Sequence, residues 1–557
     1  MPSLRPRAAA FLVGSSIALA AGSAPSVTVP GLGELQGRIS QSASDVALFA
    51  GIPYAKPPVG DLRWRPPQPY GAWESPREAK SYGSPCLGAL AMGESEDCLY
   101  LNVAARTSGL GGDAKVPVMV WLYGGAFDNG NANTYTPGAM LGASEQPVVI
   151  VTFNYRINVF GFLGSKALAA RSPDGSTGNY GLQDQRLALQ WVRDHISAFG
   201  GDGGDVTVFG QSAGGNSILH HMVQPASFGL FKRAIIESGT YESGASLADA
   251  DKIYNGLLQQ AGCKDVDCLL NMSGKDVEAV KNELFKNSTL ELLHWGPVVD
   301  GVSTTGTPQK LVAAKKFNSK VPVLMGSVRD EWSIFSNIIT GNKTFYPEKM
   351  TEEQFDRLFA YLGEENVKTV KKLYDPSAYP YPVHLGKYTK WWWMADRVGT
   401  DNGIPFHGYP ESCAFGHCSA RRVAKNLLSG GAPAVYMYLF ARPLIGNWVG
   451  HASEIPFVFH MSPVLLGTGN RKLSSAMVNY WTRFAVTGNP NPSPGATDDA
   501  LTEWPRFAPE GDKASLRFDA TMWAANITVE HNLRGAACDF WDSLADGGSS
   551  SSQLILV

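Results

Sequence analysis

The strongest candidate for chemistry in this chain is a serine between two glycines. Residues 207–215 read TVFGQSAGG and contain the pattern Gly-x-Ser-x-Gly, with Ser212 at its centre. The apolar run Val206–Phe209 precedes the serine and helix-forming residues follow it, which predicts a strand, a sharp turn and a helix. The small Gly210 and Gly214 allow strand and helix to approach closely. This context predicts that Ser212 is a nucleophile, with the N–H groups of a helix start directed toward its oxygen.

A serine hydroxyl needs a base to become nucleophilic, and the base needs an acid to orient it. Two adjacent carboxylates, Asp330 and Glu331, follow the apolar run Val321–Gly326, and spacing does not separate them. In the expected fold the base follows the acid along the chain. Six histidines do so, and His451 is the candidate because it stands in a loop after a glycine and before an apolar run.

The reaction also needs N–H donors for the negative oxygen of a tetrahedral intermediate. The residue after the nucleophile, Ala213, supplies one in this architecture, and a glycine-rich loop after an earlier strand supplies the others. The loop WLYGGAFDNG at 121–130 fits, because it follows an apolar run and contains Gly124, Gly125 and Ala126. Small residues let the main chain approach a carbonyl oxygen.

The segments around these residues alternate between apolar runs and helical periodicity. The runs are rich in β-branched and aromatic residues, as in strands buried on both faces. They span 116–123, 147–155, 206–209, 233–238, 321–326 and 435–440, and a helix is expected at 182–199. This alternation predicts an α/β protein with a large, mostly parallel central sheet and helices on both faces. The stretches 245–318 and 347–426 are expected to be helical excursions from that sheet.

Composition and the two termini restrict the class of protein. The 557 residues are 44% hydrophobic, with a net charge of −3 and no basic run, so no nucleic-acid partner is expected. Residues 1–24 are expected to be a cleaved signal peptide, because Arg5 and Arg7 precede an apolar run, Ala8–Ala21, that is too short to cross a bilayer. A secreted protein without stable membrane insertion is therefore predicted. The Gly/Ser-rich residues 546–557 are expected to be a flexible tail.

Cysteines and sequons agree with export. The seven cysteines form no CxxC pair or zinc-finger pattern, which favours disulfides over a metal site. Glycosylation sequons, which are common by chance, begin at Asn271, Asn287, Asn342 and Asn526.

Several longer motifs resemble one family. In chain order they are EDCLYLNV, YGGAF, NYRINVFGFL, GNYGLQDQRLALQWVRDHISAFGGD, VFGQSAGG, RDEWSIF and GHASEIPFVF. Together they resemble the type-B carboxylesterase/lipase family, which includes cholinesterases and fungal lipases, over residues 27–541. The resemblance implies an α/β-hydrolase fold, one catalytic domain at 25–545, a small-molecule ester substrate and no metal or organic cofactor.

The resemblance also assigns roles. It implies that the catalytic triad consists of Ser212, Glu331 and His451. It implies an oxyanion hole formed by the N–H groups of Gly125, Ala126 and Ala213. Two further residues, Ser238 and Glu454, are implied to lie near the triad. The chain departs from the family pattern at Gln211, which replaces a glutamate, and at Trp332, which replaces a glycine and is expected to narrow the space beside the acid.

The implied disulfides are Cys86–Cys98, Cys263–Cys268 and Cys418–Cys538, with a Cys413–Cys418 pair as the alternative to the last. Eleven residues without an aromatic separate Cys86 from Cys98. The loop therefore lacks the tryptophan with which cholinesterases hold a quaternary ammonium group, and it is short for a lipase lid.

These features favour a general esterase for dissolved esters. A lipase for longer-chain acylglycerols is the alternative, and a non-catalytic binding protein of the same fold is a further one. The oligomeric state is not predicted. For Trp391–Trp393, packing in the core is favoured over a place in a substrate pocket.

Overall fold

The computed structural model describes residues 24–74, 76–112, 115–286, 295–333, 348–377, 388–403, 415–444, 448–492 and 501–546 of the chain. The expected signal peptide and C-terminal tail lie outside these residues except for one residue each, and Cys413, Asn287 and Asn342 also lie outside them. Among the described residues, no helix combines the length and apolar character that a membrane crossing needs.

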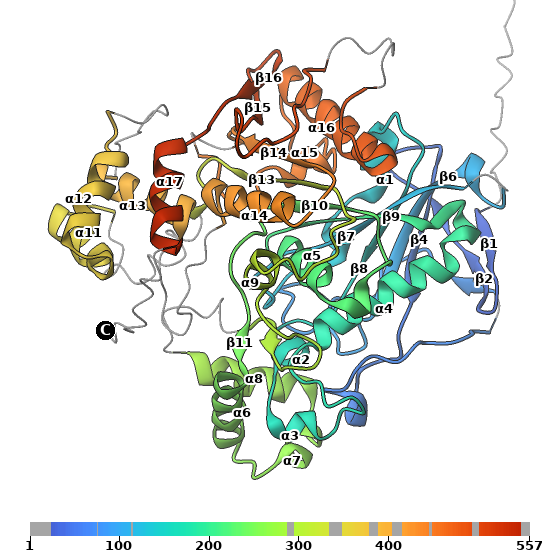
Figure 1. Cartoon of the computed structure of the whole chain (residues 1–557). Coiled ribbons are helices and arrows are strands. Elements are labelled where there is room, and N and C mark those ends of the chain that lie inside the picture. Colours follow the sequence, from blue (N-terminus) through green and yellow to red (C-terminus); the bar gives the residue numbers. More distant parts are fainter. Residues whose placement is uncertain are drawn as a thin grey trace, which may run out of the picture.

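An 11-stranded sheet forms the centre of the described structure (Figure 1). Its order is β16-β15-β14-β13-β10-β9-β7-β8-β6-β4-β3. The strands are parallel from β8 to β15, and antiparallel pairs lie at both ends. Their bounds in chain order are β3 Arg38–Ile39, β4 Val46–Pro53, β6 Tyr100–Arg106, β7 Val116–Leu122, β8 Val149–Phe153, β9 Gly201–Gln211, β10 Arg233–Glu237, β13 Val323–Val328, β14 Val435–Phe440, β15 Ser515–Ala520 and β16 Ala525–Glu530.

Helices cover both faces of this sheet (Figure 1). On one face, α4 (Tyr180–His195) and α5 (Ala213–Val223) pack on β9, and α14 (His417–Ser429) packs on β13 and β14. On the other face, α1 (Pro137–Ala143) packs on β6 and β8, and α16 (Thr468–Thr487) packs on β15 and β7. All residues of β8 and β14 are buried, as expected for strands covered on both sides. This is the α/β arrangement predicted from the apolar runs.

Two helical groups extend from the sheet, as predicted (Figure 1). One follows β10 and contains α6 (Leu247–Ala261), α7 (Val266–Leu270) and α8 (Gly274–Phe285). The other follows β13 and contains α11 (Glu352–Phe359), α12 (Glu364–Leu373) and α13 (Lys390–Asn402). The C-terminal α17 (Gly535–Asp546) contacts α12, α13 and α14.

Three disulfides are present among the described residues: Cys86–Cys98, Cys263–Cys268 and Cys418–Cys538. The last one joins α14 to α17 across 120 residues of sequence. These are the pairs that the family resemblance implies, and the alternative Cys413–Cys418 pair is therefore wrong.

Candidate active site

Ser212 stands between the end of β9 and the start of α5. Its backbone has φ 56° and ψ −123°, a conformation that costs free energy for a residue with a side chain. Two backbone hydrogen bonds stabilise this conformation. The Ser212 N–H donates to the Glu237 carbonyl at 2.8 Å, and the Ser212 carbonyl accepts from the Asn216 N–H. Ser212 thus caps α5, whose first N–H groups have no partner within the helix.

Close backbone packing surrounds this turn. A Cβ on Gly214 would lie 1.9 Å from the Leu122 carbonyl oxygen of β7, so only glycine fits there. A Cβ on Gly124, in the loop after β7, would lie 2.8 Å from the Cβ of Ser212. The glycine-rich loop and the serine therefore lie against one another, at the carboxyl ends of the neighbouring parallel strands β7 and β9.

Glu331 and His451 meet near this turn, although 120 residues separate them in sequence. The Nδ1 atom of His451 lies 2.5 Å from Oε2 of Glu331. The other oxygen, Oε1, accepts from the Ser238 hydroxyl at 2.6 Å and from the Val328 N–H at 2.8 Å. Both side chains are buried, which strengthens these interactions. The acid is thereby fixed by three donors at the carboxyl ends of β10 and β13 and in the loop after β14.

The structure separates the two adjacent carboxylates that spacing left open. Asp330 pairs with Arg329 at 2.8 Å, and it accepts from the Val449 N–H at 3.1 Å. Its own N–H donates to the Val449 carbonyl. Asp330 therefore anchors the loop that carries His451, whereas Glu331 contacts the imidazole itself.

The second ring nitrogen of His451, Nε2, contacts the side chain of Gln211. This atom is 3.0 Å from the side-chain nitrogen of Gln211, the residue directly before Ser212. The ring of Phe415 packs against the imidazole with centroids 4.9 Å apart. The structure thus places His451 between Glu331 and the turn that carries Ser212.

The loop expected to form the oxyanion hole has an unusual backbone. Gly125, Ala126 and Phe127 all have positive φ, and the two residues with side chains are at 57° and 58°. The Asn158 N–H donates to the Phe127 carbonyl at 2.7 Å, and the Asn158 side chain donates to the Asp128 carbonyl at 3.1 Å. These bonds keep the strained loop in place next to Ser212 and Ala213.

Two further carboxyl groups lie buried close to the triad candidates. Burial raises the pKa of Glu237 to about 7, although a hydrogen bond from Trp481 at 2.8 Å opposes the shift. Burial, with repulsion from Glu237 and Glu331, raises the pKa of Glu454 well above its ordinary value. Glu454 is predicted from the sequence to lie near the triad, whereas Glu237 is not, although it directly precedes Ser238.

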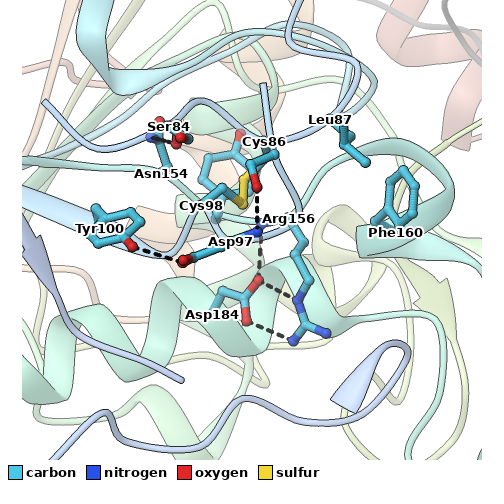
Figure 2. The surroundings of a disulfide bond; sticks show 12 residues. Ser84, Cys86, Leu87, Asp97, Cys98, Tyr100, Asn154, Arg156, Phe160 and Asp184 are labelled. Carbon is cyan, nitrogen blue, oxygen red and sulfur yellow. Dashed lines mark hydrogen bonds and ion pairs between the residues drawn. A yellow bond between two sulfur atoms is a disulfide. The ribbon is translucent and has the colours of Figure 1, made fainter. Parts of the chain in front are cut away.

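The disulfide loop between Cys86 and Cys98 is shown in Figure 2 and is joined to the loop expected to form the oxyanion hole. Asn158 links the two, because its side chain also donates to the Leu87 carbonyl at 2.8 Å. Within the loop, the Glu94 carboxylate accepts from the N–H groups of Gly88 and Ala91, at 3.0 and 2.6 Å. Arg156 and Asp184 form a buried ion pair beneath the disulfide, at 2.7 Å.

Tryptophans near the site pack in the core. Trp332 is buried, and a Cβ on Gly399 of α13 would lie 2.6 Å from its ring. On the same helix Trp392 and Trp393 are buried, and Trp392 stacks on Tyr388 with centroids 4.1 Å apart. Core packing is predicted for Trp391–Trp393, and Trp391 is partly buried against the same cluster. Trp332 is accommodated by a glycine of the opposing helix.

Comparison with known proteins assigns the family. A sequence model described as the carboxylesterase family matches residues 23–541. The chain belongs to the carboxylesterase family. It is 32% identical to carboxylesterase 1D of Rattus norvegicus, over 90% of this chain and 89% of that protein. It is 31% identical to an acetylcholinesterase of Danio rerio, over 90% and 84%, respectively.

Solved structures of esterases support the same family and fold. A carboxylesterase of Geobacillus stearothermophilus superposes with a TM-score of 0.73 at 29% identity, covering 93% of this chain and 99% of that one. A thermophilic PNB esterase superposes with a TM-score of 0.72 at 30% identity, covering 92% and 99%. The carboxylesterase-family chain therefore has the α/β-hydrolase fold and is a carboxylic ester hydrolase.

Proposed function

We propose that this family member is a secreted serine carboxylesterase with a Ser-His-Glu triad. Ser212 is the nucleophile, His451 the general base and Glu331 the acid that orients the base. The observation that carries this assignment is the 2.5 Å contact between Glu331 and His451 Nδ1, beside a strained serine turn at the carboxyl edge of the sheet. Ser238 and Glu454 support the triad from outside it, and Ser238 does so by donating a hydrogen bond to the Glu331 carboxylate.

The proposed reaction is acyl transfer in two steps. His451 Nε2 takes the hydroxyl proton as the Ser212 oxygen attacks the ester carbonyl. The N–H groups of Gly125, Ala126 and Ala213 donate to the resulting oxyanion. The alcohol leaves with the proton from His451, and water then repeats the sequence on the acyl-enzyme. Each proton moves between the serine, the imidazole and the leaving group or water, so no metal or organic cofactor enters the steps.

The disulfide loop supports dissolved esters as the substrate class. The Glu94 carboxylate accepts two backbone hydrogen bonds within this short loop, and the Asn158 side chain donates a third to it, so the loop is held in place. A fastened loop differs from a lid that opens at an oil surface. The side chains of Leu90 and Met92 are 84% and 96% exposed at its tip, and this feature favours the second candidate function, a lipase.

Secretion and glycosylation are part of the proposal. The three disulfides agree with an oxidising compartment. The asparagines of two sequons, Asn271 and Asn526, are exposed on the surface. Analysis of the culture medium and N-terminal sequencing of the mature protein test export and cleavage near Ala24.

A rate comparison tests the substrate class. Hydrolysis of p-nitrophenyl acetate and butyrate is measured in solution, beside tributyrin across its emulsification threshold, with Ser212→Ala as the blank. The proposal predicts hydrolysis of the soluble esters and no jump in rate at the threshold. A jump at the threshold favours the lipase, and the absence of Ser212-dependent hydrolysis on all substrates favours the binding protein.

A further inference from the structure

Gln211 occupies a position that the triad alone leaves unexplained. It ends β9 directly before Ser212, and its side chain is buried with the residue 3% exposed. The side chain reaches across to His451, where the amide nitrogen lies 3.0 Å from Nε2. On its other side, the amide oxygen lies 3.0 Å from the Cβ that Gly124 lacks. The amide is therefore packed between the glycine-rich loop and the imidazole.

The chemistry of the two nitrogens fixes the direction of this hydrogen bond. A side-chain amide nitrogen carries two hydrogens and accepts none, so Nε2 of His451 must be the acceptor. The ring proton then resides on Nδ1, which donates to Glu331 at 2.5 Å. This is the tautomer that a general base requires. The lone pair that must accept the Ser212 proton thus already accepts a hydrogen bond from the Gln211 amide.

A donor to this lone pair affects the two protonation states differently. It stabilises the neutral imidazole, whose lone pair it engages. It opposes the imidazolium, which carries a hydrogen on the same nitrogen. We propose that Gln211 is a positioning residue that keeps His451 neutral in the free enzyme and so extends ester hydrolysis to lower pH. This inference rests on the proposed triad.

Other charged groups around His451 are the same in every Gln211 variant. Glu331 bonds Nδ1 from the loop after β13, and Asp330 beside it is paired with Arg329. Glu237 at the end of β10 and Glu454, three residues after the histidine, are further buried carboxyl groups, and Asp396 of α13 is buried near Asp330. A difference in pH dependence among variants at this one position therefore reports on residue 211.

During attack the proton balance requires the amide to yield. The Ser212 O–H bond breaks as its oxygen bonds to the carbonyl carbon, and the proton goes to Nε2. The imidazolium then presents an N–H where the Gln211 N–H had donated. The amide either turns its oxygen to this hydrogen or moves aside, and a free reversal of the amide removes the predicted preference for the neutral ring.

Two substitutions separate these cases. Gln211→Met keeps the length of the side chain and removes the donor, and Gln211→Glu places a carboxylate at the imidazole. We expect the acid limb of the kcat/KM–pH profile for p-nitrophenyl butyrate to move to higher pH in both. The expected shift is about 0.5 to 1 pH unit for Met and about 1 to 2 for Glu. The control Gln183→Met alters a buried glutamine of α4 that bonds Ser176, and it leaves the acid limb in place.

A second measurement does not depend on turnover. The ring resonances of 13C-labelled histidine, with His451 assigned through His451→Gln, are followed against pH in the parent and in the three glutamine variants. Titration midpoints that rise from the parent to Gln211→Met and then to Gln211→Glu support the proposal, whether or not an ester is hydrolysed. If these midpoints are found but no ester is hydrolysed, the proposed function fails and the inference on Gln211 stands. A Gln211→Met midpoint and acid limb equal to or below those of the parent overturn it.

Discussion

The triad candidates and the disulfide loop are neighbours held in place by different means. Glu331 is positioned by buried donors from three parts of the sheet edge, namely Ser238, the Val328 N–H and His451. The loop between Cys86 and Cys98 is positioned by its covalent bond and by local bonds from Glu94. A substitution among the triad candidates alters a hydrogen-bond network that several elements share, whereas a substitution in the disulfide loop alters only the conformation of that loop. Substitutions in the first region should therefore change chemistry, and those in the second should change mainly stability.

The largest contrast is expected between the two adjacent carboxylates. Glu331→Gln keeps the shape but removes the acceptor charge facing His451 Nδ1, and it should lower kcat by about 10³- to 10⁴-fold. Asp330→Asn weakens the pair with Arg329 and should lower kcat less than about tenfold, with the main effect on thermal unfolding. Steady-state kinetics and melting curves of both variants measure this. Equal losses of kcat would contradict the assignment of the acid.

Removal of the loop disulfide should come next in size. The double variant Cys86→Ser/Cys98→Ser frees a loop whose ends are 12 residues apart, which should cost about 2 to 4 kcal/mol of unfolding free energy. The kcat/KM of the folded protein should stay within about threefold, because no proposed triad contact passes through this loop. Denaturant unfolding and active-site titration check the two parts. A collapse of kcat/KM without loss of stability would show that the regions are not separable.

Glu237 predicts a pH dependence of stability in the first region. Burial raises its pKa to about 7 from an ordinary 4.5. The folded state therefore holds more protons than the unfolded state between these values, and stability falls as pH rises from about 4.5 to about 7 and then levels off. Glu237→Gln keeps an acceptor for Trp481. It should reduce the fall in unfolding free energy between about pH 4.5 and about pH 7 by up to about 3 kcal/mol. Urea titrations at pH 4.5, 6 and 8 test it, and an unchanged slope would assign it to other groups.

Glu94 should give the smallest effect. Glu94→Ala removes the carboxylate that accepts hydrogen bonds from two backbone N–H groups of the disulfide loop. It should lower the free energy of local opening of this loop by about 1 kcal/mol. Hydrogen exchange at residues 87–92 should increase, with no change at the Ser212 turn. Increased exchange at both places would mean that the loop and the oxyanion loop open together through Asn158.

The sequence predicted the fold well because it depends on strongly periodic segments. The apolar runs at 116–123, 147–155 and 435–440 became β7, β8 and β14 within two residues at each end. Parallel strands bring their carboxyl ends to one edge, so the positions of Ser212 and the glycine-rich loop followed from topology.

Contacts that depend on atomic detail were not predictable in this way. Asp330 and Glu331 are adjacent, and what separates them is the direction of each side chain, toward Arg329 or toward His451. The Gln211–His451 contact joins residues 240 apart in sequence, and Glu237 accepts a hydrogen bond from Trp481 of a distant helix. The disulfide partners came from the family resemblance, since spacing alone left Cys418 with two possible mates.

The most direct test of the central claim is covalent labelling of the nucleophile. The parent protein, Ser212→Ala and Glu331→Gln are treated with a fluorophosphonate and mapped by peptide mass spectrometry. We expect one adduct per molecule on Ser212 in the parent, none in Ser212→Ala and a labelling rate reduced at least a hundredfold in Glu331→Gln. A parent that stays unlabelled at Ser212, or that carries its adduct on another serine, would contradict it.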